Sequence, residues 1–203
     1  MAAGSEIISL IVDRQDLEQF RRKTWEGSFE EYLESVRQHP EITRNAFERV
    51  YDMVMSYGVE TRDRGREKHV HYRFFDDPDD GGRDAVFGHD GTLQQLVNAL
   101  KSAAQGYGIE RRVLLLHGPV GSSKSTIVRL LKKGLQRYTT RDEGALFSMG
   151  WTSLEEDGVV HWCPMHEEPL HLIPDRFRPD VAAQLQSASP PEGHKIKITG
   201  DLC

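Results

Sequence analysis

The chain has 203 residues, of which 37% are hydrophobic and 29% are charged, and its formal net charge is −6. Its sequence contains no apolar run of the ~18 residues that a membrane-spanning helix needs, and its net negative charge argues against a general nucleic-acid coat. We therefore expect a soluble chain of one domain, or a domain with a helical appendage, without nucleic-acid or membrane partners.

The N-terminus and the cysteine content both favour a cytoplasmic protein. The opening "MAAGSEIISLIVDRQ" has a short apolar patch but no basic leader, so we do not expect secretion. The two cysteines, Cys163 and Cys203, are too few for a disulfide framework. We expect the protein to work in reducing, cytoplasmic surroundings.

Apolar residues recur at helical spacing in the first third of the chain. The run "SFEEYLESVRQHP" places one set on a single helix face, namely Phe29, Tyr32, Leu33 and Val36. Ser28 and Glu31 have the spacing of a capping box at the start of this helix. The next run, "PEITRNAFERVYDMVMSYG", repeats the pattern with Phe47, Val50, Tyr51 and Val54. We assign residues 1–67 to an N-terminal helical region.

A polar stretch follows these helices. The segment "RDRGREKH" (Arg62 to His69) mixes both charges, which favours a solvated linker over a nucleic-acid patch. The run "HVHYRFF" (His69 to Phe75) predicts a strand because it is rich in β-branched and aromatic residues. The acidic run "DDPDDGGRD" predicts a surface turn, since a calcium loop starting at Asp76 would need ligands at Pro78 and Phe87.

From about Ala85 the pattern alternates between helix and strand. A helix capped by Asp90 carries an apolar face of Leu93, Leu96, Val97 and Leu100. The run "RVLLLHG" predicts a strand buried on both faces over Val113 to Leu116. The helix after it has an inward face of Ile127, Leu130, Leu131 and Leu135. Further strands are expected at residues 144–151, 158–163 and 194–203, with a short helix that begins near Pro179.

Between that strand and that helix lies "GPVGSSKST", which nearly matches the phosphate-binding loop G-x-x-x-x-G-K-[ST]. Gly118 and Gly121 supply the turn, Lys124 can reach the β- and γ-phosphates, and Ser125 places a hydroxyl where Mg²⁺ is held. The backbone amides at the helix N-terminus point at the anion. The residues expected to bind ATP are Gly118, Pro119, Val120, Gly121, Ser122, Ser123, Lys124, Ser125 and Thr126.

One position departs from the pattern, because Ser123 stands where glycine is expected. The loop uses the N–H of that residue, which serine retains, so serine is acceptable where φ is negative and costly where it is left-handed. The alternative is an incidental turn that happens to contain a lysine. The strand–loop–helix context favours a nucleotide loop.

Several stretches together resemble the PrkA family of bacterial serine protein kinases: "YLESVRQHPEITRNAFERVYDMV", "YRFFDD", "VFGHD", the nucleotide loop and "CPMHEEPLHLIP". The resemblance runs from about Phe29 to Cys203. It implies an N-terminal module similar to an AAA+ ATPase, in proteins considerably longer than this chain. It also implies that Val86, Phe87 and Gly88 flank the adenine base, although Val86 and Phe87 are also explained as packing residues.

The expected fold class is therefore α/β, an incomplete αβα core of the P-loop AAA+ type over residues 68–203. No apolar strand ending in paired acids follows Trp151, so the Walker A loop is present and the Walker B strand is absent. We expect the chain to end within the module and assign no catalytic residue. The strand "VLLLH" would then lack neighbours and expose apolar faces, so the chain would be marginally stable or would associate.

Three functions remain open from the sequence. The resemblance favours the ATP-binding module of a serine protein kinase, with Mg²⁺ as cofactor and a protein as substrate. An AAA+ motor for protein remodelling or proteolysis, assembled as a homo-oligomer in its full-length form, is the second. A non-catalytic nucleotide-binding fragment is the third.

The segment "CPMHEEPLH" also leaves an alternative open. Cys163, His166 and the later Cys203 have spacing suited to zinc, and the fourth ligand would be His171, Glu167 or a residue beyond the end of this chain. A loop with surface histidines and one packed cysteine explains the same residues.

Overall fold

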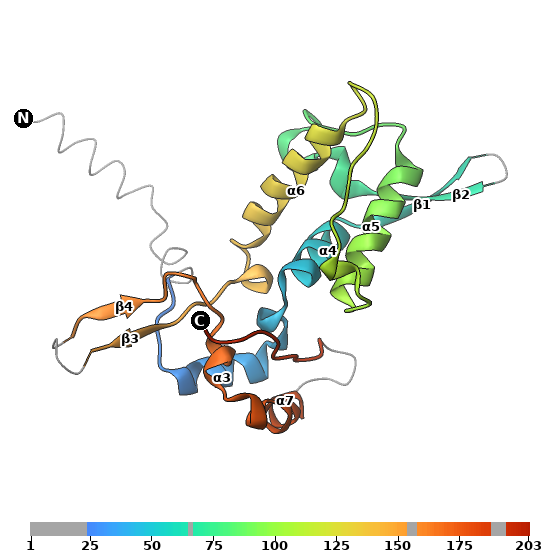
Figure 1. Ribbon diagram of the computed structural model, residues 1–203. Helices are drawn as coiled ribbons and strands as arrows, with labels where there is room; N and C mark the ends of the chain where they lie inside the picture. The colour runs from blue at the N-terminus through green and yellow to red at the C-terminus, as the bar shows by residue number, and fades with distance from the viewer. Residues whose placement is uncertain (1–23, 65–66, 154–157, 188–193) are drawn as a thin grey trace, which may run out of the picture.

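The computed structural model describes residues 24–64, 67–153, 158–187 and 194–203. Its helices and strands are α3 (Phe29–Gln38), α4 (Ala46–Ser56), β1 (Val59–Arg64), β2 (Glu67–Tyr72), α5 (Asp90–Ala104), α6 (Lys124–Tyr138), β3 (Gly150–Thr152), β4 (Val160–Trp162) and α7 (Arg178–Gln186), joined by short 3₁₀ turns. Helices α4, α5 and α6 gather beside the β1–β2 hairpin, whereas α3 and α7 lie together near the C-terminus (Figure 1). None of the helices in the described ranges is long and apolar enough to span a membrane.

The first two helices begin at side-chain caps. Ser28 and Glu31 form the expected capping box at the start of α3, with the Glu31 amide donating to Ser28 Oγ at 3.2 Å. Asn45 and Glu48 form a second capping box at the start of α4. Pro40 begins a separate 3₁₀ turn, Pro40–Thr43, rather than the second helix. The helix positions were therefore predictable from local sequence.

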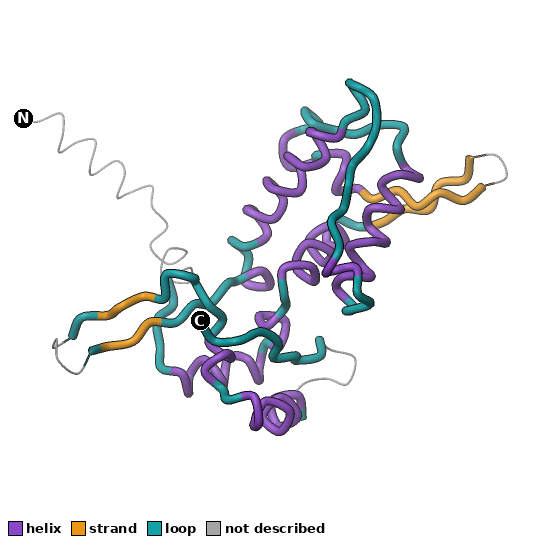
Figure 2. The backbone as a smooth tube through the Cα atoms, in the orientation of Figure 1, coloured by secondary structure: helices purple, strands orange, loops and turns teal. Residues whose placement is uncertain are grey.

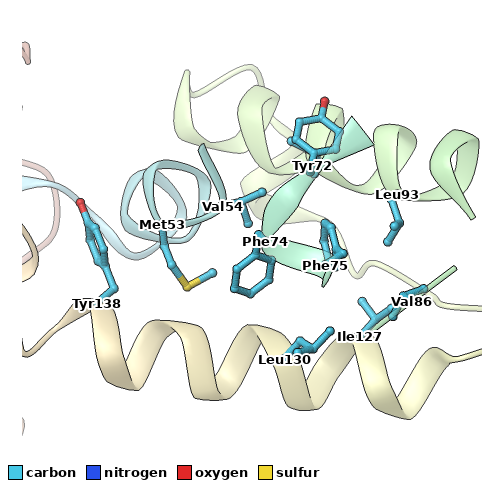
Figure 3. Close-up of a cluster of buried hydrophobic side chains, with 11 residues drawn as sticks. Met53, Val54, Tyr72, Phe74, Phe75, Val86, Leu93, Ile127, Leu130 and Tyr138 are labelled. Atoms are coloured by element: carbon cyan, nitrogen blue, oxygen red, sulfur yellow. The ribbon is translucent and has the colours of Figure 1, made fainter. Parts of the chain in front are cut away.

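The larger hydrophobic core is built from α4, β2, α5 and α6. Figure 3 shows its side chains filling the space between α6 and the other elements. Its buried members are Met53, Val54, Tyr72, Phe74, Phe75, Val86, Leu93, Val97, Ile127, Leu130 and Tyr138. The inward faces predicted for α5 and α6 are confirmed. Of the face predicted for α4, Val54 is buried but Phe47 is exposed, and the helix buries Met53 and Arg49 instead.

A second, smaller core joins distant parts of the chain. Its buried members come from α3, the following 3₁₀ turn and the C-terminal third, namely Tyr32, Val36, Ile42, Leu170, Ile173, Leu185 and Ile196. Helix α7 lies beside α3 in this core (Figure 1). The N-terminal helix thus packs against residues at the other end of the sequence.

Arg49 joins the two cores through backbone carbonyl groups. Its guanidinium donates to the carbonyl oxygens of Ile42 (2.6 Å), Arg44 (2.8 Å) and Gly144 (2.9 Å), and only 5% of the residue is exposed. Burying this charge is tolerable because each of the three guanidinium nitrogens donates to a carbonyl oxygen. The side chain therefore holds α4 against the turn after α6.

The only sheets in the described ranges are two antiparallel hairpins, β1–β2 and β3–β4. In the first, Val59 pairs with Tyr72 and Thr61 with Val70. The predicted strand at 69–75 is therefore shifted, since β2 ends at Tyr72 and a 3₁₀ turn follows. The linker expected at 62–69 contributes to both strands. The strand predicted over residues 194–203 is wrong, because that segment does not pair with any described strand.

The buried strand predicted over Val113 to Leu116 is also wrong. Residues 113–119 have no regular structure and lie in loop (Figure 2), and Val113 and Leu115 are 93% and 83% exposed. A strand completes its hydrogen bonds only with a neighbouring strand, and no described residue pairs with this run. The expectation that this run would expose its apolar faces is confirmed.

The described residues mix helix and strand, which is compatible with an α/β P-loop fold. They do not contain the parallel sheet at the centre of the expected αβα core. The boundary expected after residue 67 falls inside the β1–β2 hairpin, and α4 packs on both α5 and α6.

Candidate functional site

The loop at residues 118–126 turns directly into α6, as the pattern indicates. The Ser122 hydroxyl donates to the Pro119 carbonyl at 2.8 Å, which closes the turn. Lys124, the first residue of α6, reaches back over the loop. Its ammonium donates to the carbonyl oxygens of Gly118 (2.8 Å) and Pro119 (2.6 Å) and to Ser122 Oγ (2.9 Å). All three N–H groups of the ammonium are therefore bonded to atoms of the loop itself.

The amides at the start of α6 have no partner in the described part of the chain. Those amides belong to Gly121, Ser123, Lys124, Ser125 and Thr126. The first turn of α6 carries no acidic residue, and no side chain caps it. Unpaired N–H groups and the positive end of the helix dipole make this terminus attractive to an anion.

The backbone of the loop requires small residues at defined positions. A Cβ atom on Gly118 would lie 2.8 Å from Ser122 Oγ, and Gly121 has φ +83°. Ser123 has φ +57°, in the left-handed region that costs a non-glycine residue energy. The departure from the pattern at Ser123 is thus the unfavourable case. Val120 at the tip is fully exposed.

A ladder of ion pairs fastens the acidic turn before α5 to the outer face of α6. Arg129 pairs with Asp84 (3.0 Å), and Lys133 pairs with Asp84 (3.2 Å) and Asp80. Arg137 pairs with Asp80 (2.6 Å). Hydrogen bonds from Lys133, with further pairing to the arginines, lower the pKa values of both aspartates. The ladder fixes the turn relative to the loop-bearing helix.

These ion pairs were not predicted from the sequence, where the acidic run indicated only a surface turn. The available signal was the spacing of Arg129, Lys133 and Arg137, which lie four residues apart and therefore share one face of α6. Spacing on one helix does not say which acidic segment will face it. The pairing with Asp80 and Asp84 depends on tertiary packing.

The segment after this turn passes beside α6. Val86 is buried and lies next to Ile127 of α6 (Figure 3), and its amide donates to the Phe75 carbonyl at 2.9 Å. Phe87 is 79% exposed, and Gly88 has φ +75°. Val86 is therefore a packing residue, and the exposed Phe87 ring is the member of this segment that a ligand can contact.

A buried histidine holds the far end of the same segment. His71 Nδ1 lies 2.9 Å from Asp90 Oδ1 and Nε2 lies 2.8 Å from Asp76 Oδ2. Two carboxylate partners suit an imidazolium ring, in which both nitrogens donate. The interaction links β2 to the first residue of α5 and so fixes both ends of residues 76–90.

A wide groove elsewhere in the described ranges does not include the loop among its lining residues. It has a volume of about 1040 Å³ and is lined by aromatic residues that include Trp25, Phe29, Phe147, Trp151 and Trp162. It lies between the start of α3 and the β3–β4 hairpin. Residues 118–126 do not line this groove, so an anion at the loop would be held by backbone amides and charge rather than by enclosure.

The structure brings together some of the candidate zinc ligands. Cys163, Glu167 and Cys203 place one ligand atom each within 4.8 Å of one another. His166, expected from the C-x₂-H spacing, is exposed and is not part of this group. His171 lies beside Glu167, with Nδ1 3.6 Å from Oε1.

Comparison with known proteins gives a family for this chain. The family described as PrkA AAA domain matches residues 27–203. The chain is 40% identical over 186 residues to the protein named "ATP-dependent protease PrkA" of Bacillus subtilis (strain 168), covering 91% of this chain and 25% of that protein. It is 32% identical over 109 residues to the "Uncharacterized protein in gldA 5'region" of Geobacillus stearothermophilus, covering 53% of this chain and 99% of that protein. No solved structure matches.

The family match covers the loop, both cores and the segment before α5. The chain spans about a quarter of the length of the Bacillus subtilis relative. Activity, substrate and partners of a whole protein of that length are therefore matters for proposal.

Proposed function

Because the chain belongs to the PrkA AAA domain family, we propose that it is the ATP-binding part of an enzyme that acts on proteins. The observation that carries the proposal is the loop at 118–126, where Lys124 and the unpaired amides at the start of α6 meet. A lysine ammonium and a row of amides together suit a polyphosphate.

Nucleotide binding exchanges contacts within the loop. The Lys124 ammonium bonds to neutral oxygens of Gly118, Pro119 and Ser122, and phosphate oxygens replace these partners with charged ones. The ammonium carries its positive charge in both sets of bonds, and the phosphate oxygens add a negative charge on the acceptor side, so the added attraction favours the bound state. Ser125 is exposed at the helix start and would hold Mg²⁺, which neutralises phosphate charge when bound.

We assign the adenine side of the site to residues 86–88. Val86 packs on Ile127 and so holds this segment beside the loop-bearing helix, while Phe87 offers an exposed ring for contact with the base. Gly88, at φ +75°, lets the backbone turn away after Phe87. The ion-pair ladder on α6 keeps this segment in place.

Two reactions are candidates for the whole protein. Transfer of the γ-phosphate to a protein serine is the activity that the sequence resemblance implies. ATP-powered proteolysis or remodelling is favoured by the name of the Bacillus subtilis relative. Both require ATP at the same loop, and we assign no catalytic residue to this chain. A homo-oligomer is proposed for the full-length form in either case.

One experiment separates these possibilities. The full-length protein is incubated with casein and ATP labelled in its γ-phosphate, and phosphoserine, free phosphate and casein fragments are measured. Label on serine supports the kinase, and phosphate release with cleavage supports the protease. Binding without turnover supports a non-catalytic module. Absence of ATP binding by full-length protein would overturn the proposal as a whole.

A further inference from the structure

A group of sulfur, oxygen and nitrogen ligands lies at the C-terminal end of the described chain, away from the nucleotide loop. Cys163, Glu167 and Cys203 place their ligand atoms within 4.8 Å of one another. Cys163 is 1% exposed, and both thiols are free. Two cysteines and a carboxylate this close together make up most of a tetrahedral metal site.

Several hydrogen bonds place Cys203 beside Cys163. The Cys203 amide donates to Glu167 Oε2 at 3.0 Å. Arg178 donates to the Gly200 carbonyl at 2.6 Å and to the Ile173 carbonyl at 2.9 Å. These two bonds hold the backbone at Gly200 close to the backbone at Ile173. Contacts within the cluster and from Arg178 outside it therefore place Cys203 beside Cys163.

The loop around Cys163 is also defined by its backbone. The His166 amide donates to the Cys163 carbonyl at 3.0 Å, and His166 has φ +50°. This tight turn places Glu167 back beside Cys163 while His166 points into solvent. The turn therefore selects Glu167 over His166 as a neighbour of the thiols.

His171 lies beside Glu167, next to the three residues whose ligand atoms are within 4.8 Å of one another. Its Nε2 lies 2.9 Å from the Thr199 carbonyl, which accepts only from an N–H. A neutral ring then carries its lone pair on Nδ1, which is buried, without a hydrogen bond, and 3.6 Å from Glu167 Oε1. A lone pair facing a carboxylate is unfavourable unless a proton on Nδ1 or a metal ion lies between them, and two neighbouring thiols make a metal ion the better fit. Histidines that bind metals commonly donate their other N–H to a carbonyl in this way.

We propose that Cys163, Glu167, His171 and Cys203 bind one Zn²⁺ ion in a structural site. Thiolate and imidazole ligands select zinc over magnesium or calcium, and four protein ligands leave no open position for catalysis. The ion joins the "CPMHEEPLH" loop to the final residues of the chain. It also neutralises most of the charge of two thiolates and a carboxylate.

The test uses the chain purified with a reducing agent and measures zinc by mass spectrometry of the metal. We expect about one zinc ion per chain. Cys163→Ser and Cys203→Ser should remove it, and His171→Ala should weaken zinc affinity by about 10-fold to 100-fold in a chelator competition. Circular dichroism checks that each variant is folded, and Glu167→Gln, at a half-buried ligand, gives a second variant if a cysteine variant fails to fold.

His166→Ala is the matched control, because it removes a histidine from the same loop and should retain zinc. Loss of zinc from this control, or zinc retained by Cys203→Ser, would overturn the ligand assignment. A metal-free chain whose thiols are both open to alkylation, or joined as a disulfide, would overturn the site itself. Lys124→Ala should keep its zinc, so the outcome is independent of nucleotide binding.

Discussion

The two sides of the nucleotide loop differ sharply in how they are packed. On one side, α6 buries Ile127 and Leu130, which are 4% and 2% exposed. On the other, the equally apolar run at 113–117 exposes Val113 and Leu115 almost fully. A helix satisfies its own backbone and needs only one apolar stripe against a core. A strand needs neighbours for its backbone and for both faces.

Matched leucine substitutions test this difference most strongly. Leu130→Ala in α6 should lower the free energy of unfolding by about 3 kcal/mol, because it removes buried methyl groups and leaves a cavity. Leu115→Ala, which is 83% exposed, should change it by less than about 0.5 kcal/mol. Urea denaturation measures both. Equal losses would mean that the run at 113–117 is packed as tightly as α6.

The smaller core offers a pH test. Burial, with a contribution from nearby Arg44, lowers the pKa of His194 to about 4. Between about pH 6.5 and pH 4 the unfolded state therefore binds a proton that the folded state does not, so stability falls as the pH drops through this window. After solvent screening the loss is of the order of 1 to 2 kcal/mol.

His194→Asn isolates this contribution from the carboxylates that titrate nearby. Comparison of urea midpoints at pH 7 and pH 4.5 should show a smaller acid-induced loss in the variant than in the natural chain. Identical losses in the two proteins would show that His194 titrates normally when folded.

The junction between the two sides is the place for a stabilising change. Ser123 has φ +57°, which glycine adopts without steric cost. Ser123→Gly should raise the unfolding free energy by about 1 kcal/mol and leave ATP affinity equal or tighter. Thermal melts and nucleotide titration measure the two effects. Destabilisation would indicate that the serine side chain makes a compensating contact.

Substitutions in the exposed run at residues 113–117 should change the stability of the chain little and its self-association clearly. We expect the chain to self-associate through exposed apolar residues such as Val113 and Leu115. Leu115→Lys should reduce the association seen in sedimentation velocity while changing the unfolding free energy by less than about 0.5 kcal/mol. A natural chain that is monomeric and melts cooperatively contradicts this expectation.

Local sequence predicted the parts of the fold that depend on neighbours in sequence. Ser28 and Glu31 marked the start of α3, and the apolar spacing of Ile127 and Leu130 gave the inward face of α6. The run from Val113 to Leu116 was wrongly predicted as a buried strand, because strand formation depends on neighbouring strands that the run itself does not reveal. The antiparallel β1–β2 hairpin was missed because its charged residues do not alternate with apolar ones.

The candidate sites divide in the same way. The loop and its lysine were recognisable because the phosphate-binding pattern lies within nine consecutive residues, 118–126. The ion-pair ladder from Arg129 to Asp84 and the choice of Glu167 over His166 beside Cys163 depend on tertiary contacts. Spacing along the sequence does not show which of these side chains contact one another in the folded chain.

The central claim is that Lys124 and the amides at the start of α6 bind the phosphates of ATP. Isothermal titration of ATP and Mg²⁺ into the natural chain and into Lys124→Ala tests it most directly, with Lys132→Ala, an exposed lysine on the same helix, as control. We predict that Lys124→Ala weakens binding by about 100-fold, or about 3 kcal/mol, because a charged hydrogen-bond donor is lost. Binding by Lys132→Ala should match the natural chain. Unchanged affinity in Lys124→Ala would contradict the account.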